Sequence, residues 1–227
     1  MHGLTAGWPT VRLGAIGEAW QLYKRHWIVW SVTMLVSVAS SLVLRWFTTG
    51  FLHIASGGMF GGFIGLHPPG LPLVPTIVSA MIGGFFLGGM MRMAVGQVRG
   101  RAPRVGDLFS VTDVWFDLVL GSALLGLVVS LGLSLFVIPG LIASGLLFLT
   151  HPLIVDGRLP ATGAIIQSFH VLKSQWVRAT VVHLALAFVA GLGILAFGIG
   201  WLITGPLYVL SVAILYRDFF LAPRSPF

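Results

Sequence analysis

The chain has 227 residues, of which 57% are hydrophobic and only 8% are charged. Soluble domains carry about 25% charged residues, so this composition excludes a water-exposed globule of this size. The formal net charge is +7 and cysteine is absent, which excludes disulfides and thiolate metal sites. In a chain this apolar, we interpret the basic excess as cationic residues on the cytoplasmic side of a membrane, and not as a nucleic-acid surface.

The first part of the chain combines an amphipathic segment with long apolar stretches. Residues 11–26 separate apolar from charged side chains at helical spacing, which predicts a helix lying in the membrane interface. A span needs about 20 mostly apolar residues, and the first two are predicted at 27–47 and 74–98. The connection at 48–73 is rich in Gly and Pro and holds no charged residue. We expect it at the outer interface.

The middle of the chain continues with shorter connections. A third span is predicted at 115–137, followed by a turn at Pro139-Gly140. The fourth span, at 141–155, is short and contains Pro152. Residues 156–176 form a second amphipathic segment, again expected to lie in the interface.

Two further spans, at 177–197 and 201–216, bring the predicted number to six. With both termini inside, every Lys and Arg except Arg45 falls on the cytoplasmic side, and an odd number of spans would break this positive-inside bias. We therefore expect an all-α polytopic bundle of six transmembrane helices with cytoplasmic interfacial helices. It forms one integral membrane domain over residues 1–227, in a cell inner membrane and with cytoplasmic N- and C-termini.

Two pairs of segments in the sequence are alike. Residues 14–27 align without gaps with 163–176, and both begin with Gly-Ala-Ile and end in Trp. Residues 140–149 align with 200–209 and share two glycines. We interpret this as a three-fold hairpin repeat, in which each unit is an interfacial helix followed by a helical hairpin, with units at 11–98, 104–156 and 160–218.

Several motifs in order along the chain resemble a known family. They are the basic loop at 99–109, the FVIPG sequence at 136–140, and the segments 146–173 and 206–218. These motifs are similar to the membrane-domain family attached to some glycerophosphodiester phosphodiesterases, which includes many uncharacterised bacterial and archaeal multi-pass proteins. The resemblance implies six membrane helices, with a Pro-Gly turn, a second Pro and a helical Ser at Pro139-Gly140, Pro152 and Ser168. It implies no phosphodiesterase activity, because the catalytic barrel is not among these residues.

Two histidines are the candidate intramembrane polar site. His151 precedes Pro152 late in the fourth span, and His183 lies early in the fifth, so both lie toward the cytoplasmic half. An ionisable residue within a span is by default a functional hypothesis. The alternative is a neutral imidazole bonded to a neighbouring backbone. Two histidines without an adjacent carboxylate or thiolate make a poor metal site, so we expect no metal and no other cofactor.

Four arginines near the end of the second span are candidate contacts for anionic lipid. They are Arg92, Arg99, Arg101 and Arg104. For Arg92, snorkelling of a structural side chain to the interface is the alternative. Asp113 and Asp117 lie one helical turn apart, and we expect them to form an interface ion pair with Arg92 or Arg99.

Small residues at spacings of four mark candidate helix-packing faces. Gly84 and Gly88 lie in the second span, and Gly126 and Ser130 lie in the third. Small side chains let helices approach closely in lipid. We expect most of these contacts to be internal, and some to face a partner subunit.

The sequence therefore predicts a non-enzymatic membrane protein, an accessory or lipid-interacting component of a membrane assembly. No catalytic motif is found, and no acid lies in mid-span. The expected partners are membrane lipids, with a membrane-protein partner or a second copy as further options, and no nucleic acid. One alternative is a small-solute or lipid transporter with a cavity near His151, Pro152 and His183. A weaker alternative is a membrane enzyme that acts on lipid with one of these histidines as base.

Overall fold

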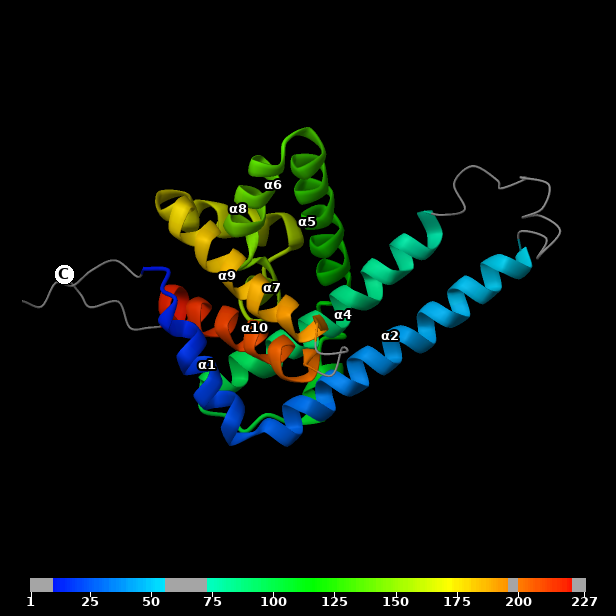
Figure 1. Cartoon of the computed structure of the whole chain (residues 1–227), viewed down its shortest axis with the longest axis horizontal. Coiled ribbons are helices and arrows are strands. Elements are labelled where there is room, and N and C mark those ends of the chain that lie inside the picture. Colours follow the sequence, from blue (N-terminus) through cyan, green and yellow to red (C-terminus); the bar gives the residue numbers. More distant parts are fainter. Residues whose placement is uncertain (1–9, 56–72, 196–199, 222–227) are drawn as a thin grey trace, which may run out of the picture.

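The computed structural model describes residues 10–55, 73–195 and 200–221, and every regular element in these ranges is helical (Figure 1). The predicted all-α class is therefore confirmed for this part of the chain. Most of the predicted outer connection at 48–73 lies outside the described residues. The main helices are α1 (Gly14–Arg25), α2 (Trp27–Ala55), α4 (Leu73–Val98), α5 (Trp115–Leu135), α6 (Val137–Leu147), α7 (Thr150–Val155), α8 (Ala161–Leu172), α9 (Trp176–Leu195) and α10 (Trp201–Tyr216). Shorter turns are η1 (Val105–Phe109), η2 (Lys173–Gln175) and η3 (Arg217–Leu221).

Five helical stretches in the described residues are long and apolar enough to cross a membrane. They are Trp27–Leu44, Trp115–Leu135, Val137–Val155, Ala161–Gly193 and Trp201–Leu221. Helix α4 occupies the second predicted span but is not among these five stretches. The structure therefore supports membrane insertion, while the count of six spans stays a prediction.

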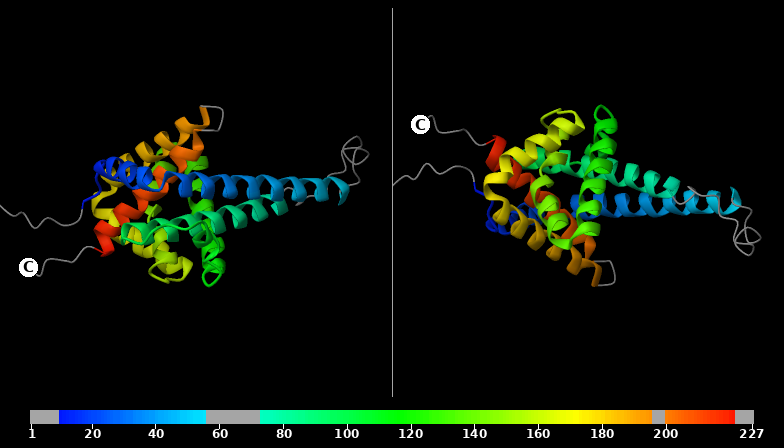
Figure 2. Two further views of the ribbon diagram at one scale, coloured as in Figure 1. Left: turned by 90° about the horizontal axis from the view of Figure 1, so that it is seen from below. Right: turned by 90° about the horizontal axis from the view of Figure 1, so that it is seen from above.

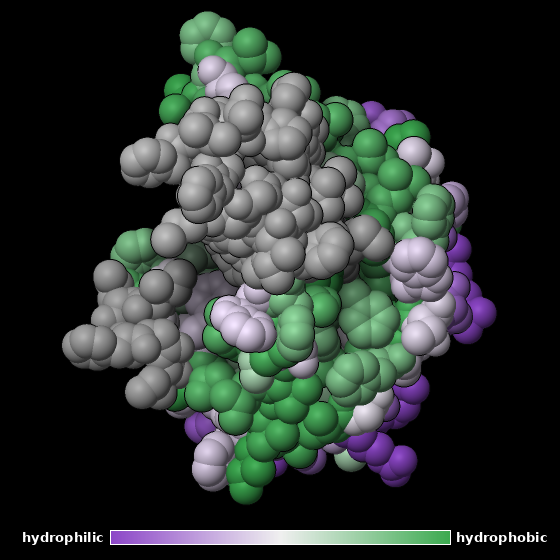
Figure 3. Space-filling model, turned by 90° about the vertical axis from the view of Figure 1, so that its right-hand side faces the viewer, coloured by the Kyte–Doolittle hydropathy of each residue, from purple (hydrophilic) through white to green (hydrophobic). Residues whose placement is uncertain are grey.

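The long helices form three hairpins, which are α2 with α4, α5 with α6, and α9 with α10. The hairpins point away from one another, and α2 and α4 extend furthest (Figures 1 and 2). Helix α1 and η3 lie together at the opposite end from the α2–α4 tip. Figure 3, which faces that tip, shows mostly hydrophobic residues, with hydrophilic ones at the margin.

The second helix of each hairpin packs on the first helix of another. Helix α4 packs on α5, α6 packs on α9, and α10 packs on α2. A glycine lies in each of these contacts, where an added Cβ would collide with the neighbouring helix: Gly88 against Leu118, Gly145 against Thr180, and Gly205 against Met34.

The turn between α5 and α6 corrects one prediction. The chain turns at Phe136, whose backbone is extended, and Pro139 lies inside the first turn of α6. A turn at Pro139-Gly140 is therefore wrong, because Pro is well accommodated in a first helical turn, where its missing N–H needs no acceptor. Gly140 instead allows close approach, since a Cβ there would meet the backbone nitrogen of Leu133.

The fourth predicted span is divided into two helices. Helix α6 ends at Leu147 and α7 begins at Thr150. Pro152 explains the interruption, because its ring cannot donate to the carbonyl of Phe148, four residues earlier, and crowds it. The second repeat unit was predicted to open at residue 104 with an interfacial helix before the span at 115. The only regular part of that segment in the structure is the 3₁₀ turn η1.

Candidate anion site at the polar end

The acidic residues lie in or beside α1, η1, η3, the first turn of α5 and the end of α7, and two of them bind arginines at the end of α4. We call this region, together with the last turns of α4, the polar end. Each of the six acids accepts at least one hydrogen bond there. The pairs are Glu18 with Arg12 and Arg217, Asp218 with the same two arginines, Asp113 with Arg92, Asp156 with Arg99 and Tyr216, Asp107 with the N–H of Arg104, and Asp117 with the N–H of Ala161.

Arg92 joins three segments at the polar end. Its guanidinium donates to Asp113 at 2.7 Å and to the carbonyl of Val155 at 3.2 Å, and it also contacts the carbonyl of Ser110. The hydrogen bond from Arg92 holds the pKa of Asp113 below its ordinary value. The predicted pairing of Arg92 with Asp113 is confirmed, whereas Asp117 instead accepts from the N–H of Ala161 at the start of α8.

Arg99 is also neutralised by a carboxylate. Its guanidinium lies 2.6 Å from Asp156, which also accepts a hydrogen bond from the Tyr216 hydroxyl at 2.8 Å. The Asp156 side chain is only 13% exposed. Asp156 therefore joins the end of α7 both to Arg99, which follows α4, and to Tyr216 of α10.

Arg101 and Arg104 differ from these two arginines. Neither forms an ion pair with an acid in the part of the chain that the structure describes. Both line a pocket of about 560 Å³ between the end of α4 and η1, together with Arg92, Gln97 and Asp107. We call it the basic pocket. Three arginines and one aspartate give it a net positive charge.

Local backbone geometry places the arginines around this pocket. Helix α4 ends in a Schellman motif, in which the N–H of Arg101 donates to the carbonyl of Gly96 and that of Gly100 donates to Gln97. Gly100 has φ of 86°, a left-handed conformation that glycine adopts without strain. This turn folds the Arg101 guanidinium back over Gly96, where an added Cβ would lie 3.2 Å from Nη2.

The two predicted histidines lie in different helix interfaces. His151 Nε2 lies 3.1 Å from Ser122 Oγ of α5. The His183 ring packs between Phe148 and Tyr208, at centroid distances of 5.8 and 6.0 Å. Among the described residues no hydrogen bond or ring contact joins the two histidines, and neither lines the basic pocket. Pro152, the third predicted member, is buried and interrupts the helix.

Of the two candidate helix-packing faces, one is buried against a neighbouring helix and the other is exposed. Gly84 and Gly88 of α4 are buried against α5, where added Cβ atoms would meet Ser122 and Leu118. Internal packing is confirmed for this pair. A Cβ on Gly126 would meet nothing within 4 Å, and exposed Ser130 donates to a carbonyl of its own helix. This second face therefore has no neighbour in the described part of the chain.

A buried polar link at the polar end was not predicted from the sequence. Trp30 Nε1 donates to Gln97 Oε1 at 2.7 Å, and Gln97 Nε2 donates to the carbonyl of Leu22 at 2.9 Å. The link joins α4, α2 and α1. The only sequence signal for it is a Gln at the apolar end of a predicted span, which does not identify its partners.

Acidification tests the ion-pair network that joins α1 to η3. The hydrogen bond from Arg217, with a second one from Arg12, lowers the pKa of Glu18 below its ordinary value. The pKa of Glu18 is lower in the folded protein than in the unfolded chain. The ion pairs of Glu18 therefore contribute fully to stability at any pH above the unfolded-state pKa, and this contribution is lost as the pH falls through the folded-state pKa. Between about pH 5 and pH 3, we expect thermal unfolding to depend less steeply on pH in Glu18→Gln than in wild type. If the unfolding temperatures of the two proteins depend equally steeply on pH, the ion pairs of Glu18 do not stabilise the fold.

Comparison with known proteins gives no match to a family model, to a curated protein or to a solved structure. The resemblance to the phosphodiesterase-associated membrane domains therefore stays a prediction.

Proposed function

We propose that this protein binds the phosphate of an anionic lipid in the basic pocket, as a non-enzymatic lipid-interacting component of the cytoplasmic leaflet. The observation that carries the proposal is that Arg101 and Arg104 line a pocket and form no ion pair with any carboxylate of the described residues. Arg92 and Arg99, by contrast, are held by Asp113 and Asp156.

Arginine is the side chain best suited to such a ligand. Its planar guanidinium offers donors in a fork that matches phosphate oxygens. Basic pockets beside membrane helices on the cytoplasmic side bind phosphorylated lipid headgroups. Arg92, fixed by Asp113 and the Val155 carbonyl, supplies a third guanidinium whose position is set before a ligand arrives. The Asp107 carboxylate accepts from the Arg104 N–H, and this bond fixes the start of η1.

The proposal includes six spans with both termini in the cytoplasm. The gathering of acids and arginines at the polar end supports this orientation, because the positive-inside rule assigns such an end to the cytoplasm. The three hairpins point away from one another, and the α2–α4 hairpin extends furthest from the polar end (Figure 2). Helix α4, the second span in chain order, then completes the set of six, with Arg92 in its last two turns.

We also propose that the chain consists of three parallel repeat units. The short helix that begins each unit packs on another hairpin: α1 on α10, η1 on α4, and α8 on α5, α6 and α7. The glycine contacts between hairpins follow the same order around the molecule. This cyclic pattern supports a pseudo-three-fold arrangement and accounts for the sequence similarity of 14–27 to 163–176.

The first test is lipid binding by the double variant Arg101→Ala/Arg104→Ala. A cation near an anionic surface contributes about 1 kcal/mol, so losing two lowers affinity roughly 30-fold. We expect native mass spectrometry of the detergent-purified protein to show that loss for one bound phosphatidylglycerol, and little change for phosphatidylcholine.

A matched double variant separates the pocket from general charge. Arg25→Ala/Arg178→Ala removes two exposed cations that do not line the pocket. We expect it to retain phosphatidylglycerol binding within about threefold of wild type. Equal losses in both double variants would show that net charge, and not the basic pocket, determines binding.

A further inference from the structure

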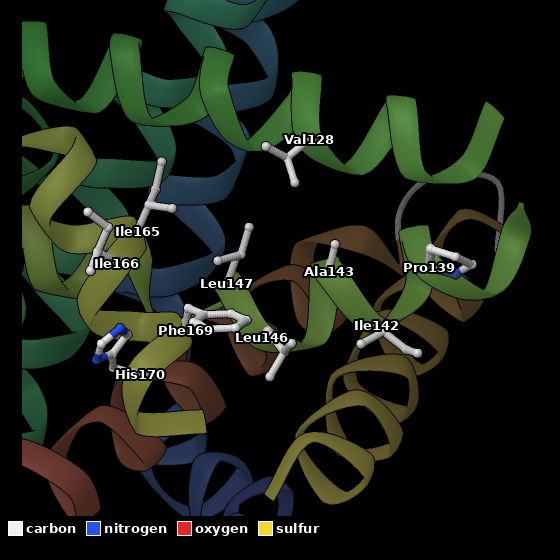
Figure 4. Close-up of a pocket in the computed structure, with 10 residues that line it drawn as sticks. All are labelled: Val128, Pro139, Ile142, Ala143, Leu146, Leu147, Ile165, Ile166, Phe169 and His170. Carbon is white, nitrogen blue, oxygen red and sulfur yellow. The ribbon is translucent and has the colours of Figure 1, made fainter. Parts of the chain in front are cut away.

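A second pocket lies between α5, α6 and α8, and its volume is about 540 Å³ (Figure 4). Val128 of α5 forms one wall, Ala143 of α6 lies across from it, and Ile166 and Phe169 of α8 form the third side. We call it the apolar pocket. Its volume is within the range of roughly 300–1,000 Å³ that is usual for ligand sites.

The packing of the three helices creates this hollow. At one end α5 and α6 nearly touch, since a Cβ on Gly132 would lie 2.7 Å from the Cα of Gly140. At the other end Ser168 of α8 donates to the carbonyl of Leu146 at 2.8 Å. Ala143 lies between these two fixed points with only a methyl group as side chain. Helix α8 crosses the α5–α6 hairpin at a steep angle there, which leaves the corner open (Figure 4).

Hydrocarbon is the occupant that suits this lining. A buried water needs two to four polar partners, whereas His170 is the only lining residue with a polar side chain. The lining follows α6 from Pro139 to Leu147, a length of about 12 Å at the helical rise. Because α5 and the α6–α7 stretch are apolar enough to cross a membrane, the medium beside the pocket is lipid acyl chain.

One cationic side chain lies beside the pocket. Lys173 follows the lining residue His170 by three residues and begins η2, which continues α8 directly, so the two side chains are neighbours on one helical surface. No acid occurs anywhere between Asp156 and Asp218. In the described part of the chain Lys173 forms no ion pair. The positive charge of Lys173 and the hydrogen-bonding ring of His170 complement an anion.

We propose that the apolar pocket binds one acyl chain of an anionic phospholipid, whose phosphate lies at Lys173 and His170. This site is separate from the basic pocket, which is lined by α4 and η1. The lipid completes the packing of α8 against the α5–α6 hairpin.

Photolabelling of the full-length protein in mild detergent tests this proposal. The probe is phosphatidylglycerol with a diazirine on one acyl chain, compared with phosphatidylcholine that carries the same chain. Mass spectrometry of the digested protein locates the label. We expect label concentrated within 137–147 and 161–172, about fivefold stronger with phosphatidylglycerol than with phosphatidylcholine.

Four variants make the test specific. Ala143→Phe fills the hollow, and we expect label at the pocket to fall about fivefold or more. Ala187→Phe adds the same ring to an exposed position of α9 and leaves the label unchanged. Lys173→Gln keeps the shape of the pocket and abolishes the preference for phosphatidylglycerol, which decides the matter if Ala143→Phe fails to fold. Arg101→Ala/Arg104→Ala leaves this label unchanged, so failure at one pocket is distinguishable from failure at the other.

Two results would overturn the proposal. One is label spread evenly over the exposed faces of α2, α5 and α9. The other is equal labelling by the two lipids in wild type.

Discussion

Replacing Gln97 by leucine is expected to lower the free energy of unfolding by about 2–4 kcal/mol, because each buried polar group left without a partner costs about 1–3 kcal/mol. Trp30 is fully buried and donates to Gln97, which in turn donates to the carbonyl of Leu22. Leucine removes both bonds and leaves the indole N–H in an apolar setting. Thermal unfolding in mild detergent, followed by tryptophan fluorescence, measures the change.

The control for this variant is the same substitution on the surface. Gln21 lies in α1 and is exposed, so Gln21→Leu should change the free energy of unfolding by less than about 0.5 kcal/mol. Gln97→Glu keeps an acceptor for Trp30 but loses the donor to Leu22, and we expect an intermediate loss. If Gln97→Leu is as stable as Gln21→Leu, the link does not stabilise the fold.

Replacing Gly145 by alanine is the second large effect we expect, with a loss of about 1–3 kcal/mol from overpacking. A Cβ there would collide with the Thr180 backbone of α9. A side chain can rotate away from such a contact, but a backbone cannot, so the α6–α9 interface must separate. Unfolding by increasing fractions of sodium dodecyl sulfate in mild detergent measures the loss.

Gly126 provides the matched control. A Cβ on Gly126 would meet nothing within 4 Å, and alanine is favoured over glycine within a helix by up to about 1 kcal/mol. Gly126→Ala should therefore match or exceed wild type in stability. A loss as large as that of Gly145→Ala would show that this face contacts a partner subunit, and would assign the second predicted packing face to it.

The helices were predictable where a long apolar run has clear limits. The predicted span at 74–98 corresponds to Leu73–Val98, and that at 201–216 to Trp201–Tyr216. Each run is bounded by residues that break or anchor a membrane helix. The turn predicted at Pro139-Gly140 is wrong because Pro is common both in turns and in the first turn of a helix. Gly140 is needed for the close approach of α5 at Leu133, a long-range contact that the local sequence does not reveal.

The candidate site was predictable only in part. Nearness in sequence grouped the four arginines, and the Gly100 and Pro103 signals for a helix end are local. Which arginines remain without an acid was not predictable, because the partner of Arg99 lies on α7 and its hydrogen-bonded neighbour Tyr216 lies on α10. For the two histidines, the sequence indicates only that they lie at similar depths in the membrane. Depth does not specify which side of a helix a residue occupies.

The ion pairs between α1 and η3 have a consequence for the order in which this protein is made. Arg12 and Glu18 are synthesised before the three hairpins, whereas their partners Arg217 and Asp218 follow the third hairpin in the chain. Helix α1 packs mainly on α10, so most of its contacts cannot form until the α9–α10 hairpin has been made. The packing of α1 is therefore a late step in the assembly of the described fold.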